Sequence, residues 1–139
     1  MKRVKYYIKD VLEMLCEKLH DASVGDAIYA EHRPIGIGEQ LKCFSVVSLP
    51  VEIVDNGAYQ ATIVQFHLFS RNREGGISST DRLQGMLDRL IDLFPIKEGR
   101  FTLTSPKILF KGNDGSGFSM WLVQSNLVIN TTDRLEYGS

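Results

Sequence analysis

The clearest indication of the fold comes from residues 63–94, "IVQFHLFSRNREGGISSTDRLQGMLDRLIDLF". Its first seven residues alternate in character as a strand does, which places Val64, Phe66 and Leu68 on one face. From Thr80 onward, apolar residues recur at the three- and four-residue spacing of a helix, at Leu83, Met86, Leu87, Leu90, Ile91 and Phe94. Because an apolar stripe needs an apolar partner, we expect this helix, over 80–94, to pack on that strand face.

The residues before this unit predict a hairpin. "CFSVVSLPVEIVDNG", residues 43–57, alternates strictly and places on one face Cys43, Ser45, Val47, Leu49, Val51 and Ile53. Pro50 has no N–H to donate to a ladder, so it marks an edge or a bulge partway along. Asn56-Gly57 is a strong signal for a tight turn, so this strand and the next one, over 58–70, should be antiparallel neighbours. A shorter strand is expected at "DAIYAEH", residues 26–32.

Further elements are expected at both ends of the sequence. A helix near the start is indicated by helical spacing at Val4, Ile8, Val11, Leu12, Leu15 and Leu19. Its other face mixes charges of both signs, which favours packing on a sheet over lying on a membrane. Two strands are expected over 100–112 and 118–130, and Pro106 again marks an edge or a bulge. The second strand shares one face among Trp121, Val123, Leu127 and Ile129.

The predicted order is therefore α-β-β-β-α-β-β, which is an α+β fold with a mainly antiparallel sheet of about five strands and two helices packed on it. We expect a single domain over residues 1–139, the usual size of one domain, with a polar, frayed tail at 131–139.

Composition narrows the class of protein. Apolar residues make up 43% and charged residues 24% of the chain, as in ordinary soluble domains. A net charge of −1 provides no general basic field, so we expect no specific nucleic acid partner and no anionic membrane partner. No apolar run approaches the ~20 residues that cross a bilayer. Cys16 and Cys43 are interpreted as buried free thiols.

The sequence has no recognisable catalytic or metal-binding pattern. His20, His32 and His67 have no metal-ligand spacing, and the Gly36-x-Gly38 pair lacks the third glycine of a dinucleotide site. Carboxylates are scattered along helix faces, and residues 112–118, "GNDGSGF", read as a turn. We therefore expect a protein that is not an enzyme, with no catalytic residues, no cofactor and no metal. A site assembled from distant residues, or a ligand role for His67 in place of a solvent-facing or subunit-contact role, stays an alternative.

Two polar loops are the candidate contact sites for a partner. The first is "SRNREGG", residues 70–76, where Arg71, Asn72, Arg73 and Glu74 precede two glycines that allow movement. The second is the loop over 32–40, with Arg33 and Glu39. The first loop could contact an acidic patch or a phosphate, and the alternative is a solvated connection.

One family resembles this chain. The strand "YQATIVQFHLFSR", the helix "STDRLQGMLDRLIDLF" and the closing pair "KILFKGNDGSGFSMWLVQSNLVIN" are similar in order and pattern to the tail-completion and tail-terminator proteins of long-tailed bacteriophages. The resemblance covers roughly residues 4–130 and depends on element order. The long loop around residues 33–42 departs from the family pattern.

The resemblance implies a structural role in the virion or, before assembly, in the cytoplasm of a host that carries the phage or prophage. Members of the family form rings, commonly hexameric, at the head-proximal end of the tail tube, and join the tube to connector proteins. Two alternatives remain at this point: a small-ligand or regulatory binding module, and an enzyme subunit with its site at an oligomer interface.

Overall fold

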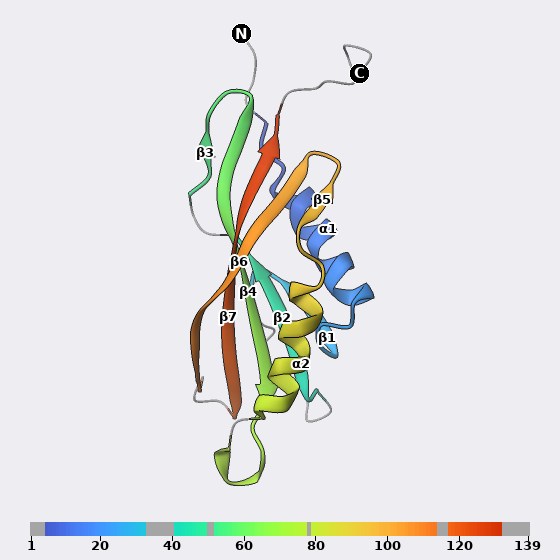
Figure 1. Ribbon diagram of the computed structural model, residues 1–139, viewed down its shortest axis with the longest axis vertical. Helices are drawn as coiled ribbons and strands as arrows, with labels where there is room; N and C mark the ends of the chain where they lie inside the picture. Colours follow the sequence, from blue (N-terminus) through green and yellow to red (C-terminus); the bar gives the residue numbers. More distant parts are fainter. Residues whose placement is uncertain (1–4, 33–40, 50–51, 78, 114–116, 132–139) are drawn as a thin grey trace.

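The computed structural model describes residues 5–32, 41–49, 52–77, 79–113 and 117–131, which form two helices and a seven-stranded sheet (Figure 1). The elements are, in chain order, α1 (Ile8–Asp21), β1 (Ala27–Ala30), β2 (Cys43–Ser48), β3 (Val54–Asp55), β4 (Tyr59–Arg71), a 3-10 turn η1 (Glu74–Gly76), α2 (Thr80–Ile91), β5 (Ile96–Glu98), β6 (Phe101–Asn113) and β7 (Phe118–Asn130).

The sheet follows the order β1-β2-β4-β7-β6-β5, and β3 pairs with β4 next to β2. Every pairing is antiparallel except β1 with β2, which is parallel. The spine is the unbroken ladder between β4 and β7, which runs from Tyr59 opposite Asn130 to Arg71 opposite Phe118. The predicted α+β class and the mainly antiparallel sheet are therefore confirmed.

The predicted count of about five strands is wrong, and one of the two additional strands is β3. The stretch over 43–53 was expected to be one strand, but it forms β2 and β3, which both pair with β4. Ser48 pairs with Gln65 and Val54 pairs with Ala61. More residues separate Ser48 from Val54 than separate their partners on β4, so the pairing along β4 is interrupted between β2 and β3. Pro50, which cannot donate to a ladder, falls in that interval, and residues 50–51 lie outside the described residues.

The other additional strand is β5, which follows α2 directly. Glu98 pairs with Phe101, which leaves Gly99 and Arg100 as a two-residue turn, and Gly99 has the positive φ of 57° that such turns favour. A strand of three residues is too short to show alternation, which is why the sequence pattern did not indicate it.

The predicted packing of α2 on β4 is confirmed. Leu83, Met86 and Leu90 belong to the same buried cluster as Val64, Phe66 and Leu68. At roughly 1.5–3 kcal/mol for each fully buried side chain, this contact is a main source of stability. The predicted helix end at residue 94 is wrong, because α2 ends at Ile91 and that side chain is 36% exposed.

Helix α1 packs on the same side of the sheet as α2 (Figure 1). Four residues of its predicted stripe are buried: Val11, Leu12, Leu15 and Leu19. Ile8 is 43% exposed, and Val4 lies outside the described residues. The predicted face of β7 is also in this cluster, through Val123, Leu127 and Ile129, with Trp121 at its margin.

A second, smaller cluster lies on the opposite face of the sheet. It contains Phe44 and Val46 from β2, Phe69 from β4 and Phe118 from β7. The rings of Phe44 and Phe69 stack at 4.6 Å between centroids, and Phe118 meets Phe44 edge-on at 5.2 Å. The one-sided burial predicted for residues 43–53 is therefore wrong for β2, which is buried on both faces.

The frayed tail was expected to begin at residue 131, but Thr131 is held to the β3–β4 turn. Its N–H donates to the Ala58 carbonyl at 3.1 Å, and its hydroxyl donates to the Gly57 carbonyl at 2.8 Å. Residues 132–139 lie outside the described residues. Within the described ranges, neither helix has the length and hydropathy of a membrane span.

Candidate functional site

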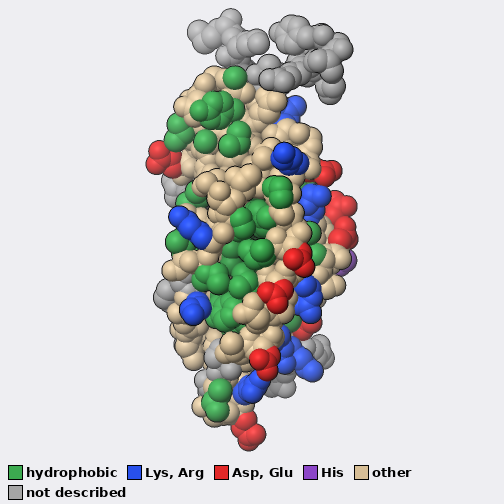
Figure 2. Space-filling view, viewed as in Figure 1, with side chains coloured by type: hydrophobic (Ala, Val, Ile, Leu, Met, Phe, Trp, Pro, Cys, Tyr) green, Lys and Arg blue, Asp and Glu red, His purple; other side chains and the backbone are tan. Residues whose placement is uncertain are grey.

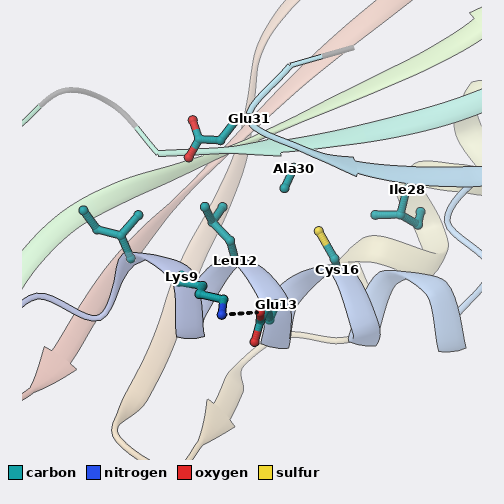
Figure 3. A pocket seen from close by; sticks show the side chains of 8 residues that line it. Lys9, Leu12, Glu13, Cys16, Ile28, Ala30 and Glu31 are labelled. Atoms are coloured by element: carbon teal, nitrogen blue, oxygen red, sulfur yellow. Dashed lines mark ion pairs between the residues drawn. The ribbon is translucent and has the colours of Figure 1, made fainter. Parts of the chain in front are cut away.

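An apolar groove lies between α1 and β1, and we call it the α1–β1 groove (Figure 3). It has a volume of about 670 Å³ and is lined by Ile8, Lys9, Leu12, Glu13, Cys16, Ile28, Ala30 and Glu31. None of these residues was among the predicted site residues.

The groove follows from two local periodicities. Ile8, Leu12 and Cys16 are four residues apart, so they form one row along the helix. Ile28 and Ala30 alternate along β1 and point towards that row (Figure 3). The row adjoins the core-facing row of Val11, Leu15 and Leu19, so the apolar face of α1 is wider than its contact with the core. This width was the sequence signal that could have indicated the groove.

The rim of the groove carries more negative than positive charge. Its charged lining residues are Glu13, Glu31 and Lys9. Lys9 Nζ lies 3.7 Å from a Glu13 carboxylate oxygen (Figure 3). Both members of this pair are exposed, so water screens their attraction and the pair adds little stability. Burial raises the pKa of the Cys16 thiol, so at neutral pH it is a packing group and a poor nucleophile.

Strand β1 forms one edge of the sheet. It pairs with β2, and the described residues place no strand on its other side. An edge strand presents backbone N–H and C=O groups that can pair with another chain. The groove therefore lies beside a strand edge, which is the arrangement used when an extended segment adds to a sheet.

A second, polar cleft lies where the turn after α1 meets β2 and α2. It has a volume of about 390 Å³ and is lined by Ser23, Gly25, Asp26, Lys42, Cys43, Asp81, Arg82, Gly85, Met86 and Arg89. The backbone N–H groups of Lys42 and Cys43 donate to Asp26 Oδ2 at 3.0 and 3.4 Å. Burial is the main cause that raises the pKa of the Cys43 thiol, so this cysteine is not activated for nucleophilic attack.

The predicted contact residues Arg71 and Asn72 lie at the base of the loop and make hydrogen bonds within the fold. Arg71 donates from its backbone N–H to the Lys42 carbonyl at 2.7 Å and from Nε to the Leu41 carbonyl at 3.1 Å. Asn72 donates from its backbone N–H to the Gly117 carbonyl at 2.8 Å and accepts from the Ser119 hydroxyl at 2.6 Å. These bonds tie the base of the loop to neighbouring segments, and both side chains are half-buried.

The predicted contact residues Arg73 and Glu74 are exposed at the tip of the same loop. The Arg73 guanidinium lies 3.4 Å from Asp81 at the start of α2, and the Arg73 N–H donates to the Ile77 carbonyl at 2.7 Å. Ile77 itself is 62% exposed, and the sequence analysis did not single it out. The accessible tip is thus Arg73, Glu74 and Ile77. Arg33 and Glu39 lie outside the described residues.

His67 lies on the sheet face opposite the helices. Its Nε2 is 3.2 Å from the Ser48 hydroxyl oxygen, and its ring stacks on Phe69 at 6.4 Å between centroids. Burial lowers the pKa of this imidazole, which favours the neutral ring. In the part of the chain that the structure describes, no group of three or more His, Cys, Asp or Glu side chains is placed to hold a metal ion.

Comparison with known proteins gives no relative: no family model and no curated protein sequence matches this chain.

Proposed function

We propose that this chain is a non-catalytic assembly protein of a phage or prophage tail, which caps the tail tube or joins it to the head connector. The observation that carries the proposal is the α1–β1 groove beside the open edge of β1. An apolar groove along an unpaired strand edge binds an extended segment of another chain through both backbone and side chains. The element order that resembles tail-terminator proteins supplies the setting.

The expected partners are other copies of this chain in a ring, the tail tube and the connector. A ring needs two different surfaces on each copy, one that meets the preceding copy and one that meets the next. A third surface must then meet the tube, and the loop tip of Arg73, Glu74 and Ile77 is our candidate. It lies at the far end of β4 from the β3–β4 turn (Figure 1).

The test uses tail-tube protein from the phage or prophage that encodes the chain. Purified protein is added to polymerising tubes, and tube lengths are measured by negative-stain electron microscopy. We expect shorter tubes with extra density at one end. Tubes whose length distribution and ends do not change with added protein would contradict the proposal.

A second function, a small-ligand or regulatory binding module, is favoured by the size of the groove. Its volume of about 670 Å³ lies within the usual range for ligand sites, and its lining is apolar with a few charged groups. A small apolar compound that binds saturably and perturbs the NMR signals of Ile28 and Ala30, combined with no effect on tubes, would favour this function.

A further inference from the structure

The edge of the sheet opposite to β1 is formed in part by β6. Strand β5 pairs only with the first residues of β6, Phe101 to Leu103. From residue 104 to 113, the described residues place no strand on the outer side of β6. Most of this long strand is therefore an open edge.

The open part of β6, residues 104–113, carries exposed apolar side chains between lysines. Ile108 is 42% exposed and Leu109 is 49% exposed, and exposed Lys107 and Lys111 flank them. We call these four residues the β6 edge. Figure 2 shows hydrophobic side chains gathered at mid-height of the molecule, between the β6–β7 pair and α2, with Lys or Arg side chains at the left margin. Large apolar side chains exposed on a strand edge indicate a contact surface.

The β6 edge and the α1–β1 groove have complementary chemistry. The groove is apolar, and its rim carries acidic Glu13 and Glu31 together with Lys9, which pairs with Glu13, so one negative charge is left over. The edge is apolar with basic Lys107 and Lys111 at its rim. Edge lysines usually keep strands from pairing, because a second lysine-flanked edge is repelled. A partner surface with an acidic rim does not repel the lysines of the β6 edge. Lys107 and Lys111 therefore disfavour pairing with another lysine-flanked edge and favour contact with this groove.

The two surfaces lie on opposite sides of the sheet's strand order: β1 is its first strand, and the open part of β6 lies on the far side. A contact between them therefore joins different surfaces on the two copies. Such a heterologous contact produces a ring when its rotation closes, and a filament when it does not.

From these observations we propose that copies of this chain associate head to tail, with the β6 edge of one copy seated in the α1–β1 groove of the next. This inference rests on the proposed assembly function for its setting and names the partner of the groove as a second copy. It assigns Glu13 and Glu31 to the acceptor side and Lys107 and Lys111 to the inserted side.

Charge reversal tests the contact. The groove variant is Glu13→Lys/Glu31→Lys, and the edge variant is Lys107→Glu/Lys111→Glu. In either variant alone, like charges meet at every contact, so self-association measured by sedimentation velocity should weaken by about tenfold or more. An equimolar mixture should recover association, because each lysine-rimmed groove then meets a glutamate-flanked edge and each glutamate-rimmed groove meets a lysine-flanked edge.

The matched control for the groove variant is Asp10→Lys/Asp92→Lys, which makes the same change in charge as that variant at exposed positions outside both surfaces. It should associate as the unaltered protein does. Circular dichroism of each variant establishes that it is folded.

Three outcomes would overturn the inference: unaltered protein that stays monomeric at the highest soluble concentration, variants that associate unchanged, and a mixture that stays monomeric. Loss of association on removing residues 132–139, with both charge variants unaffected, would assign the groove to that segment instead. The result is separate from the tube-length test: copies that associate as predicted without changing tubes would refute the tail function alone, and capping by a monomer would refute the contact alone.

Discussion

At the scale of single residues, burial decides which polar side chains can act and which are structural. Arg71 and Asn72 are adjacent to Arg73 in sequence, yet the first two are committed to hydrogen bonds and the third is exposed. Cys16 and Cys43 are free, as predicted, but only Cys43 is fully buried. In both, burial raises the thiol pKa and makes reactivity unfavourable.

His67 gives a prediction at this scale. Burial lowers its pKa in the folded state below the unfolded value of about 6.5, so the unfolded state binds the proton more strongly. Stability should therefore fall as the pH falls through about 6.5. The variant His67→Gln should lose part of this acid sensitivity, which is measured by urea unfolding at pH 7.5 and pH 5. His20→Gln, at an exposed position, is the control, and equal acid sensitivity in both variants would contradict the prediction.

At the scale of elements, the helices and strands differ in how firmly their patterns define them. Helix α2 buries a continuous row against β4, whereas α1 divides its apolar face between the core and the α1–β1 groove. Strand β6 likewise has two parts: its first three residues pair with β5, and the rest is an open edge with shifts in register around Pro106 and Leu109. The predicted edge or bulge at Pro106 is thus confirmed.

Two neighbouring residues of α2 test how the helix is seated. Leu90 is fully buried and Ile91 is 36% exposed, although both belong to the predicted stripe. Leu90→Ala should lower the free energy of unfolding by about 2–5 kcal/mol, because it leaves a cavity in the core. Ile91→Ala should cost less than about 1 kcal/mol, as is usual for partly exposed positions. Chemical denaturation measures both, and similar losses would mean that α2 is rotated from the position described.

At the scale of the whole molecule, helices cover one face of the sheet, and a loop lies at one end (Figure 1). Among the described residues, the sheet has open edges at β1 and at the part of β6 beyond β5. The two edges differ in charge and shape, which favours an assembly with direction. The loop tip is separate from both edges in the fold, so a ring built through the edges would leave every tip available.

The loop tip gives the prediction at this scale. The triple variant Arg73→Ser/Glu74→Ser/Ile77→Ser should fold normally and self-associate normally, because these side chains are exposed. It should fail to shorten tail tubes, since its contact with the tube is removed. The control Asp92→Ser/Lys97→Ser removes one acidic and one basic side chain at exposed sites beyond the other end of α2 and should keep full activity. A triple variant that caps tubes as well as the control would exclude the tip as the tube contact.

Local sequence patterns predicted the two helices, the long strands and the packing of α2 on Val64, Phe66 and Leu68. These features could be predicted because periodicity is local, and each element shows its buried side within its own residues. Polarity and glycine content indicated the loop at residues 70–76, where Arg73 and Glu74 are exposed, and their role as partner contacts stays a prediction.

Local sequence patterns could not predict three features of the tertiary structure: the parallel pairing of β1, the burial of β2 on both faces, and the α1–β1 groove. Each depends on which distant segments meet: Phe44 is buried because Phe69 and Phe118 lie beside it, whereas Ile8 lines the α1–β1 groove and is 43% exposed. Residues with the same local pattern can thus end in a core, in a groove or on an edge, because burial is a property of the assembled sheet and not of the strand or helix alone.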